Sequence, residues 1–461
     1  MLTVNARKRG FLRDGKPFFW LGDTAWLLFH KLDDRQIETY LTNRALKGYT
    51  VIQATLVHKL GYASPDGARA LVDDDFSRPD ESSAYWQHVE RAVRLAGELG
   101  LVMALLPCWG CFAQDGALNP ENAAIYGDFL ARRLGKYENV IWLLGGDVRG
   151  SAAPQTFEAL ARTLKEQCPD QLIGFHPFGR CSSSQWFAGA NWLDFHMFQS
   201  GHRDRGQRTL GAWDDPSRGD FQSPAGARES APTASRRNAV SDEEWMGEEN
   251  YLYVFRDLAR DDKPTLDGEP SYEEIPHGLH DPSKPYWTDR QVRRYAWWSL
   301  LAGAAGFTYG HNAIMQFWDG VGTPDFGVRQ HWDVALHAPG SLQMRHLRRL
   351  MEAIDWQEGR NAQALLVDDS GVEDARNLCF LTPVALAVYT YTSRPFGVRL
   401  DDLPFSPAAF WYSPKLGGVS AFALPADGRF EPPADREAAR EDWVLLLVDK
   451  KNLDSVLSRL V

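Results

Sequence analysis

Two carboxylates follow short apolar segments at points where the backbone can turn sharply. Asp147 ends the segment 140–147, VIWLLGGD, and Glu269 lies in the segment 264–270, PTLDGEP. A short apolar run bounded by turn residues is typical of a buried strand. Two carboxylates across one pocket suit glycoside hydrolysis, in which one donates a proton and the other attacks the anomeric carbon or activates water. We therefore predict that Asp147 and Glu269 face each other across one pocket.

The surroundings of these carboxylates favour different roles for them. Asp147 follows two glycines in an apolar setting, which would raise the pKa of its carboxyl group and suit a general acid/base. Glu269 has charged neighbours, which suits an ionised nucleophile. We expect a retaining mechanism from barrel enzymes, whereas a carboxyl separation well beyond about 5.5 Å would favour inversion. The opposite assignment of the two roles stays open.

Further polar or aromatic residues lie at or near the ends of the expected strands. In a barrel, these ends converge on one mouth although they are far apart in sequence. We predict that Asp23 grips sugar hydroxyls and that Trp109 and Trp318 offer stacking faces. The full set of predicted substrate-binding residues is Asp23, Gln53, His58, Trp109, His176, His196, Gln199, His311 and Trp318.

Metal and redox chemistry have weaker support in the sequence. No paired histidines have metal-ligand spacing, and the five cysteines form no framework, so we expect reduced thiols, no metal and no cofactor. One alternative is a metal-dependent hydrolase that uses His176, His196 and His311 at the barrel mouth. Another is a carbohydrate-binding barrel without catalysis.

Composition limits the partners and the compartment. A net charge of −11 argues against nucleic acid or an anionic membrane surface as the main partner. No apolar run approaches the roughly 20 residues of a membrane helix, and no apolar region follows the basic N-terminal residues. We expect a cytoplasmic protein with a carbohydrate substrate, or a secreted or periplasmic one if the sequence is trimmed. The oligomeric state is left open.

Short apolar runs alternate with helical patterns over the first three quarters of the chain. This alternation predicts parallel strands joined by helices, and the number of runs matches a (β/α)8 TIM barrel. The expected strands are 17–21, 49–57, 101–106, 140–147, 172–175, 192–195, 264–267 and 306–309.

The texture of the sequence changes after residue 358. We assign residues 1–358 to the barrel and residues 359–461 to a small all-β sandwich, because short strands there are separated by Pro, Gly and Asp. The sandwich docks on the barrel or holds a partner. A long Gly-, Ser- and Arg-rich loop at 203–240 is either a surface loop or a lid or rim of the site.

Three motifs together resemble the apiosidase-like glycoside hydrolases, family 140. They are PFFWLGDTAW at 17–26, the segment 140–147 and DGEP at 267–270. The tail from about 360 is similar to the collagen-binding-type β-sandwich that often follows this barrel. The resemblance implies a barrel glycosidase acting on plant cell-wall side chains, with apiose-containing pectin as the characterised substrate class.

The resemblance also implies that Asp147 and Glu269 are the catalytic carboxylates. Many related barrel glycosidases carry Asn-Glu at the fourth strand, where this chain has Gly146-Asp147. Family members are commonly exported, and the lack of a signal segment here favours a small imported glycoside as substrate.

Overall fold

The computed structural model describes residues 1–207, 248–322, 324–367, 370–433 and 441–460. A small antiparallel sheet opens the chain and consists of β1 (Leu2–Val4), β2 (Phe11–Arg13) and β3 (Lys16–Phe18). Within the described ranges, no helix is long and apolar enough to cross a membrane. Most of the 203–240 loop, from residue 208 onward, lies outside these ranges.

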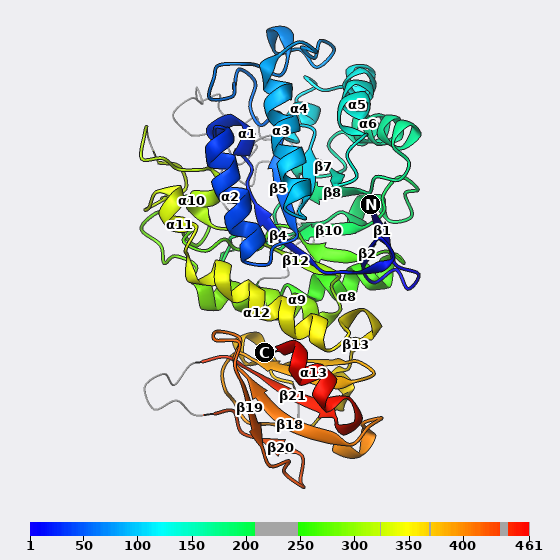
Figure 1. Ribbon diagram of the computed structural model, residues 1–461, viewed down its shortest axis with the longest axis vertical. Coiled ribbons are helices and arrows are strands. Elements are labelled where there is room, and N and C mark those ends of the chain that lie inside the picture. The colour runs from blue at the N-terminus through cyan, green and yellow to red at the C-terminus, as the bar shows by residue number, and fades with distance from the viewer. Residues whose placement is uncertain (208–247, 323, 368–369, 434–440, 461) are drawn as a thin grey trace.

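The central sheet is a nearly closed barrel, shown in Figure 1. Its parallel strands follow the spatial order β8-β7-β6-β5-β4-β12-β11-β10, and the short β9 (Cys181–Ser182) pairs antiparallel with β10. A hydrogen bond of 2.9 Å from the Asp194 amide to the Ile173 carbonyl joins the two ends of this series. The parallel strands are β4 (Trp20–Thr24), β5 (Val51–Thr55), β6 (Val102–Leu106), β7 (Val140–Val148), β8 (Ile173–Pro177), β10 (His196–Gln199), β11 (Thr265–Asp267) and β12 (Gly306–Tyr309).

Helices surround this sheet and complete the barrel that the alternating pattern predicted. Asp33 caps α2, because its side chain accepts a hydrogen bond from the Gln36 amide. The helices are α1 (Leu28–Lys31), α2 (Asp34–Leu46), α3 (Ala84–Glu98), α4 (Cys111–Gln114), α5 (Pro120–Leu134), α6 (Pro154–Gln167), α7 (Ser184–Phe187), α8 (Tyr251–Arg260), α9 (Asp289–Ala302), α10 (Asn312–Met315), α11 (Trp332–Ala335) and α12 (Pro339–Ala353).

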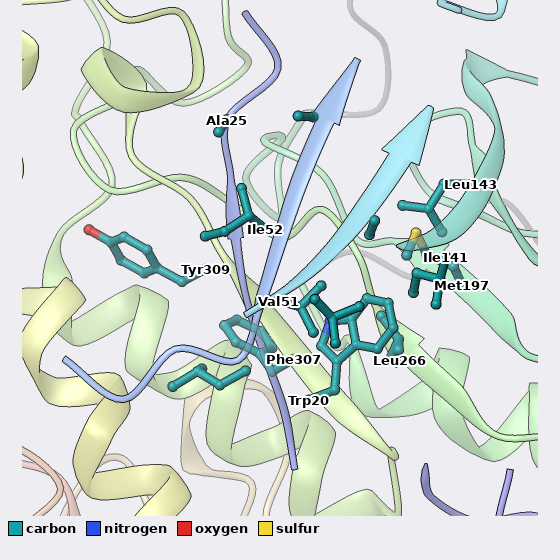
Figure 2. Close-up of a cluster of buried hydrophobic side chains, with 14 of the residues drawn as sticks. Trp20, Ala25, Val51, Ile52, Ile141, Leu143, Met197, Leu266, Phe307 and Tyr309 are labelled. Carbon is teal, nitrogen blue, oxygen red and sulfur yellow. The ribbon is translucent and has the colours of Figure 1, made fainter. Parts of the chain in front are cut away.

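Apolar side chains from these strands form the core. Every residue of β4 to β8 is buried, which explains why these strands are mainly continuous apolar runs. Figure 2 shows part of this cluster, to which β4, β5, β7, β10, β11 and β12 contribute Trp20, Val51, Ile52, Ile141, Leu143, Met197, Leu266, Phe307 and Tyr309.

Two predicted strand boundaries were wrong. The first barrel strand is Trp20–Thr24 rather than 17–21, and the sixth begins at His196 instead of ending before it. Residues 192–195 lead into the strand, and Asp194 uses its carboxylate to accept a hydrogen bond from the Ile173 amide. Apolar residues alone could not distinguish this buried approach from the strand itself.

The C-terminal domain is an all-β unit with one terminal helix, as predicted in kind. Short strands separated by turns are present throughout the domain, as the sequence indicated. One sheet has the order β13-β15-β16-β21-β18-β19, the other β14-β17-β20, and α13 (Leu453–Leu460) ends the chain. The strands are β13 (Arg360–Asn361), β14 (Leu366–Val367), β15 (Leu378–Leu381), β16 (Ala385–Thr390), β17 (Phe396–Val398), β18 (Pro407–Tyr412), β19 (Val419–Phe422), β20 (Arg429–Phe430) and β21 (Trp443–Asp449).

This domain packs against the barrel along α9 and α12, as Figure 1 shows. The Arg293 guanidinium of α9 donates two hydrogen bonds to Asp442, at 2.6 and 3.1 Å, and both side chains are buried. Trp297 stacks on Tyr389 with their ring centroids 5.8 Å apart. A buried charged pair and a stacked aromatic pair therefore fix the position of the sandwich on the barrel.

Candidate active site

A bulge at the end of β7 presents Asp147. Gly145 pairs with His176 and Val148 with Pro177, so Gly146 and Asp147 are extra residues on β7. Gly145, Gly146 and Asp147 all have positive φ, at 85°, 107° and 48°. Asp enters this left-handed region more readily than most L-residues, and a bulge with this backbone redirects the side chain that follows the strand.

Gly110 makes this bulge possible by close approach. Its amide donates a hydrogen bond of 3.1 Å to the Gly146 carbonyl. A Cβ at position 110 would lie 2.5 Å from that carbonyl oxygen and 2.4 Å from Val148 Cγ1. The Gly110 position, in the loop after β6, therefore requires glycine because it lies against the backbone that positions Asp147.

Glu269 lies two residues beyond β11, between two imidazoles. His176 Nε2 is 3.0 Å from Glu269 Oε2, and His202 Nε2 is 2.9 Å from Glu269 Oε1. The Tyr272 amide donates to His202 Nδ1 at 3.4 Å, so Nε2 of His202 carries the hydrogen that points at Glu269. Burial acts to raise the pKa of Glu269, but hydrogen bonds from the imidazoles of His176 and His202 lower it to about 2. Glu269 is therefore ionised at neutral pH.

Three predicted site residues come together here from three strands. An oxygen of Asp147, a ring nitrogen of His176 and an oxygen of Glu269 all lie within 4.8 Å of one another. All three residues are buried. Burial and the charge of Glu269, followed by that of Asp147, raise the pKa of the Tyr272 phenol well above its usual value, so Tyr272 belongs to the same cluster.

Aromatic side chains enclose the cluster on one side. Trp109 has its ring centroid 4.7 Å from that of His58 and 6.1 Å from that of His176. Trp26 packs edge-on against both Trp109 and His176, and its indole N–H donates to the Tyr272 hydroxyl at 3.2 Å. The structure therefore places the predicted residue Trp109 next to His176, and the predicted residue His58 behind Trp109.

Two predicted glutamines form hydrogen bonds near the site, Gln53 through its side chain and Gln199 through its backbone carbonyl. Gln53 donates from Nε2 to the Gly268 carbonyl at 2.9 Å, directly before Glu269. Gln199 ends β10, and its carbonyl accepts a hydrogen bond of 2.7 Å from the Arg180 amide. Both side chains are buried at the carboxyl end of the sheet.

The structure places the other predicted residues away from the carboxylates. Asp23 forms a buried ion pair of 2.5 Å with Arg44 of α2 and accepts from the Tyr40 hydroxyl. His196 begins β10, at the opposite end of the strand, and its Nε2 lies 3.0 Å from Asp261. These placements follow from the strand boundaries, because a shift along a strand changes the face or the end that a side chain occupies.

His311 and Trp318, which follow the eighth strand, form hydrogen bonds with residues outside the Asp147 cluster. His311 caps α10 by accepting from the Ala313 amide, and its Nε2 lies 2.9 Å from Gln330 Nε2. Trp318 is half-buried, and its backbone amide donates to the Ala313 carbonyl. These contacts are with α10 and with Gln330, and not with the Asp147 cluster.

Sequence reasoning missed His202, Tyr272 and Trp26 as members of the site. Tyr272 follows the Glu269-Pro270 motif by two residues, and Trp26 lies two residues beyond β4, so their positions after strands were the available signal. The five cysteines are free thiols in the structure. Burial raises the pKa of Cys111 to about 12, which argues against a reactive pair with Cys108.

The chain matches known protein families and solved structures over nearly its whole length. Residues 6–358 match the model "Apiosidase-like, catalytic domain", and residues 361–448 match "Putative collagen-binding domain of a collagenase". A solved structure described as a glycoside hydrolase is 34% identical, covers 98% of this chain and 97% of its own, and has a TM-score of 0.85. A second, described as a glycoside hydrolase family 5 protein from Bacteroides vulgatus ATCC 8482, is 32% identical, covers 98% and 94%, and has a TM-score of 0.86.

These matches confirm the resemblance to the apiosidase-like domain followed by a collagen-binding-type domain. The family number 140 stays a prediction. No protein of curated function matches the chain by sequence.

We expect Gly110→Ala to disturb the β7 bulge. The new methyl group would meet the Gly146 carbonyl and Val148, so the free energy of unfolding should fall by about 1 to 3 kcal/mol. Urea denaturation followed by circular dichroism measures this change. Gly418→Ala is the control, because a Cβ there meets no atom within 4 Å. Equal stability of the two variants would contradict the role given to Gly110.

Proposed function

This chain belongs to the apiosidase-like family of glycoside hydrolases, and from that membership we propose the chemistry of its site. The protein hydrolyses the glycosidic bond of plant-derived or small glycosides, with Asp147 as general acid/base and Glu269 as nucleophile. The observation that carries this proposal is the meeting of two buried carboxylates, from β7 and from the loop after β11, within 4.8 Å at the carboxyl ends of the barrel strands.

The electrostatics of the cluster support this division of roles. A nucleophile must be ionised before the reaction, and the lowered pKa of Glu269 meets that requirement. In the first step, a Glu269 oxygen bonds to the anomeric carbon while the Asp147 carboxyl proton passes to the departing glycosidic oxygen. In the second step, Asp147 takes a proton from water, the water oxygen bonds to the anomeric carbon, and Glu269 leaves.

The separation of the carboxylates supports retention of configuration. Retaining enzymes keep their carboxyl groups about 5 to 5.5 Å apart, whereas inverting enzymes need about 6.5 to 9.5 Å to admit a water. The closest oxygens of Asp147 and Glu269 fall within 4.8 Å. This close approach of two oxygens is compatible with direct attack by Glu269, and the anomeric configuration of the first product tests it.

A metal-dependent hydrolase is the second candidate, because the same observation favours it. Asp147, His176 and Glu269 could supply three ligand atoms to one divalent ion, as catalytic zinc sites do. Of the three histidines predicted for such a site, only His176 joins the cluster. His196 instead contacts Asp261, and His311 contacts Gln330.

Hydrolysis of aryl glycosides, including furanosides and deoxysugars, tests the proposal. We expect Asp147→Asn and Glu269→Gln each to lower kcat/KM by about 10²- to 10⁴-fold, because each removes a group that acts in the transition state. Asp115→Asn is the control, since Asp115 is an exposed carboxylate at the end of α4. Proton NMR of the first sugar released shows whether the anomeric configuration is retained. Sugar binding without turnover would instead favour a carbohydrate-binding barrel.

Metal analysis separates the two enzyme candidates. We expect dialysis against EDTA to leave activity unchanged, because acid/base and nucleophilic carboxylates need no ion. Elemental analysis of the purified protein is the companion measurement. A stoichiometric divalent metal together with loss of activity in EDTA would replace the glycosidase mechanism by the metal-dependent one.

The pH dependence should report on His202. Because His202 helps to lower the pKa of Glu269, His202→Ala should raise that pKa, and the nucleophile should become protonated at a higher pH. The acidic limb of the kcat/KM profile should therefore move up by about one to two pH units. His202→Gln keeps a hydrogen-bond donor toward Glu269 and should move the limb less. Coincident profiles for wild type and His202→Ala would contradict this role.

A further inference from the structure

The loop after β10, residues 200–207, carries the imidazole that contacts Glu269. We call it the 200–207 loop. Its inner end is tied to the β11 end, because Gly201 donates to the Glu269 carbonyl at 3.0 Å and Ser200 donates to Asp267 at 2.7 Å. The His202 carbonyl accepts from the Trp287 indole at 3.0 Å and from the Gly278 amide at 2.8 Å.

Two arginines hold the outer half of this loop. The buried Arg180 guanidinium donates to the carbonyls of Arg203, Asp204 and Gln207, at 3.1, 2.9 and 3.1 Å. Arg205, three residues beyond His202, donates from its side chain to Glu249 at 3.0 Å. The outer half of the 200–207 loop, directly after His202, is therefore held by residues outside the barrel mouth.

The C-terminal domain supplies one of these anchors. Asp374, in the segment between β14 and β15, lies 3.5 Å from the Arg205 guanidinium. The same Asp374 oxygen accepts a hydrogen bond from Arg294 of α9, which also pairs with Glu248. Glu248 in turn accepts from the Arg205 backbone amide at 2.8 Å. Asp374 thus reaches the loop directly through Arg205 and indirectly through Arg294 and Glu248.

We propose that the C-terminal domain, through Asp374, holds the 200–207 loop and so positions His202 against Glu269. The sandwich is then a working part of the active site and not only a unit docked on the barrel. Asp374 touches neither the carboxylates nor their substrate, so it is a positioning residue. The effect on catalysis rests on the proposed role of Glu269, whereas the restraint on the loop does not.

The burial of Arg294 makes this more than a surface ion pair. Exposed pairs contribute little because water screens them, but the Arg294 side chain is only 1% exposed. It is also packed over the rings of Trp298 and Tyr391, with its guanidinium carbon 4.9 and 5.1 Å from their centroids. Both Glu248 and Asp374 neutralise this buried charge. Loss of the Asp374 charge should therefore alter the contact between Arg294 and Glu248, and with it the hydrogen bond from the Arg205 amide to Glu248.

Hydrogen exchange of the whole protein tests the restraint without any substrate. We compare wild type, Asp374→Asn and Asp374→Glu, and follow peptides that cover residues 200–207 by mass spectrometry. Asp374 is about half exposed, so these variants should fold. The matched control is Arg459→Gln, which breaks the similarly exposed pair between Arg459 of α13 and Asp355, away from the loop.

We expect exchange over the 200–207 loop to become about threefold to tenfold faster in Asp374→Asn, with partial recovery in Asp374→Glu and no change in Arg459→Gln. In the active enzyme, kcat should fall by a similar factor while KM stays within about twofold, and the acidic limb should move up as for His202→Ala.

Unchanged exchange in Asp374→Asn would overturn the inference, whatever the enzyme's activity. Faster exchange with an unchanged kcat would overturn the positioning role. A wild-type protein that cleaves no glycoside would count against the proposed function alone, because the exchange comparison still decides whether the C-terminal domain holds the loop.

Discussion

The ionised state of one buried carboxylate depends on two imidazoles that approach it from different strands. A carboxylate out of water is costly unless charge and hydrogen bonds compensate it. Glu269 obtains this compensation from His176 at the end of β8 and from His202 beyond β10. The compensation exists only if β8, β10 and β11 end at the same level, so the barrel's register fixes the chemistry of the site.

The shape of the backbone places the opposing carboxylate. Asp147 lies in a two-residue bulge, and Gly145, directly before the bulge, shares the positive φ angle of Gly146 and Asp147. The close approach of Gly110 to Gly146 supports this backbone. The imidazole contacts of Glu269 and the backbone bulge at Asp147 therefore bring the two carboxylates together. This difference fits the roles proposed for them, since a nucleophile needs a stable charge and an acid/base needs a defined position.

The barrel and three of its central residues could be predicted because strand ends are visible as apolar runs that stop at Gly, Pro or a polar residue. Parallel strands bring these ends to one mouth, so Asp147, His176 and Glu269 meet without any pairwise signal in the sequence. Asp23 and His196 show the limit of that reasoning. A shift of a few residues in the assigned strand put Asp23 on the helix-facing side and His196 at the far end of β10. His202 could not be assigned a partner, because its contact with Glu269 spans 67 residues and depends on a loop held from outside the barrel.

The way the two domains meet explains why a sandwich can influence a barrel's active site. Apolar contacts such as Trp297 on Tyr389 provide adhesion but are only weakly directional. Pairs between a buried guanidinium and a carboxylate, such as Arg293–Asp442 and Arg294–Asp374, are directional, and a misplaced carboxylate leaves the buried charge uncompensated. An interface with both kinds of contact holds the sandwich on the barrel and also fixes its orientation. Arg294 lies one residue beyond Arg293 on α9. The same part of α9 therefore binds the sandwich through Arg293 and positions Asp374, which contacts the 200–207 loop, through Arg294.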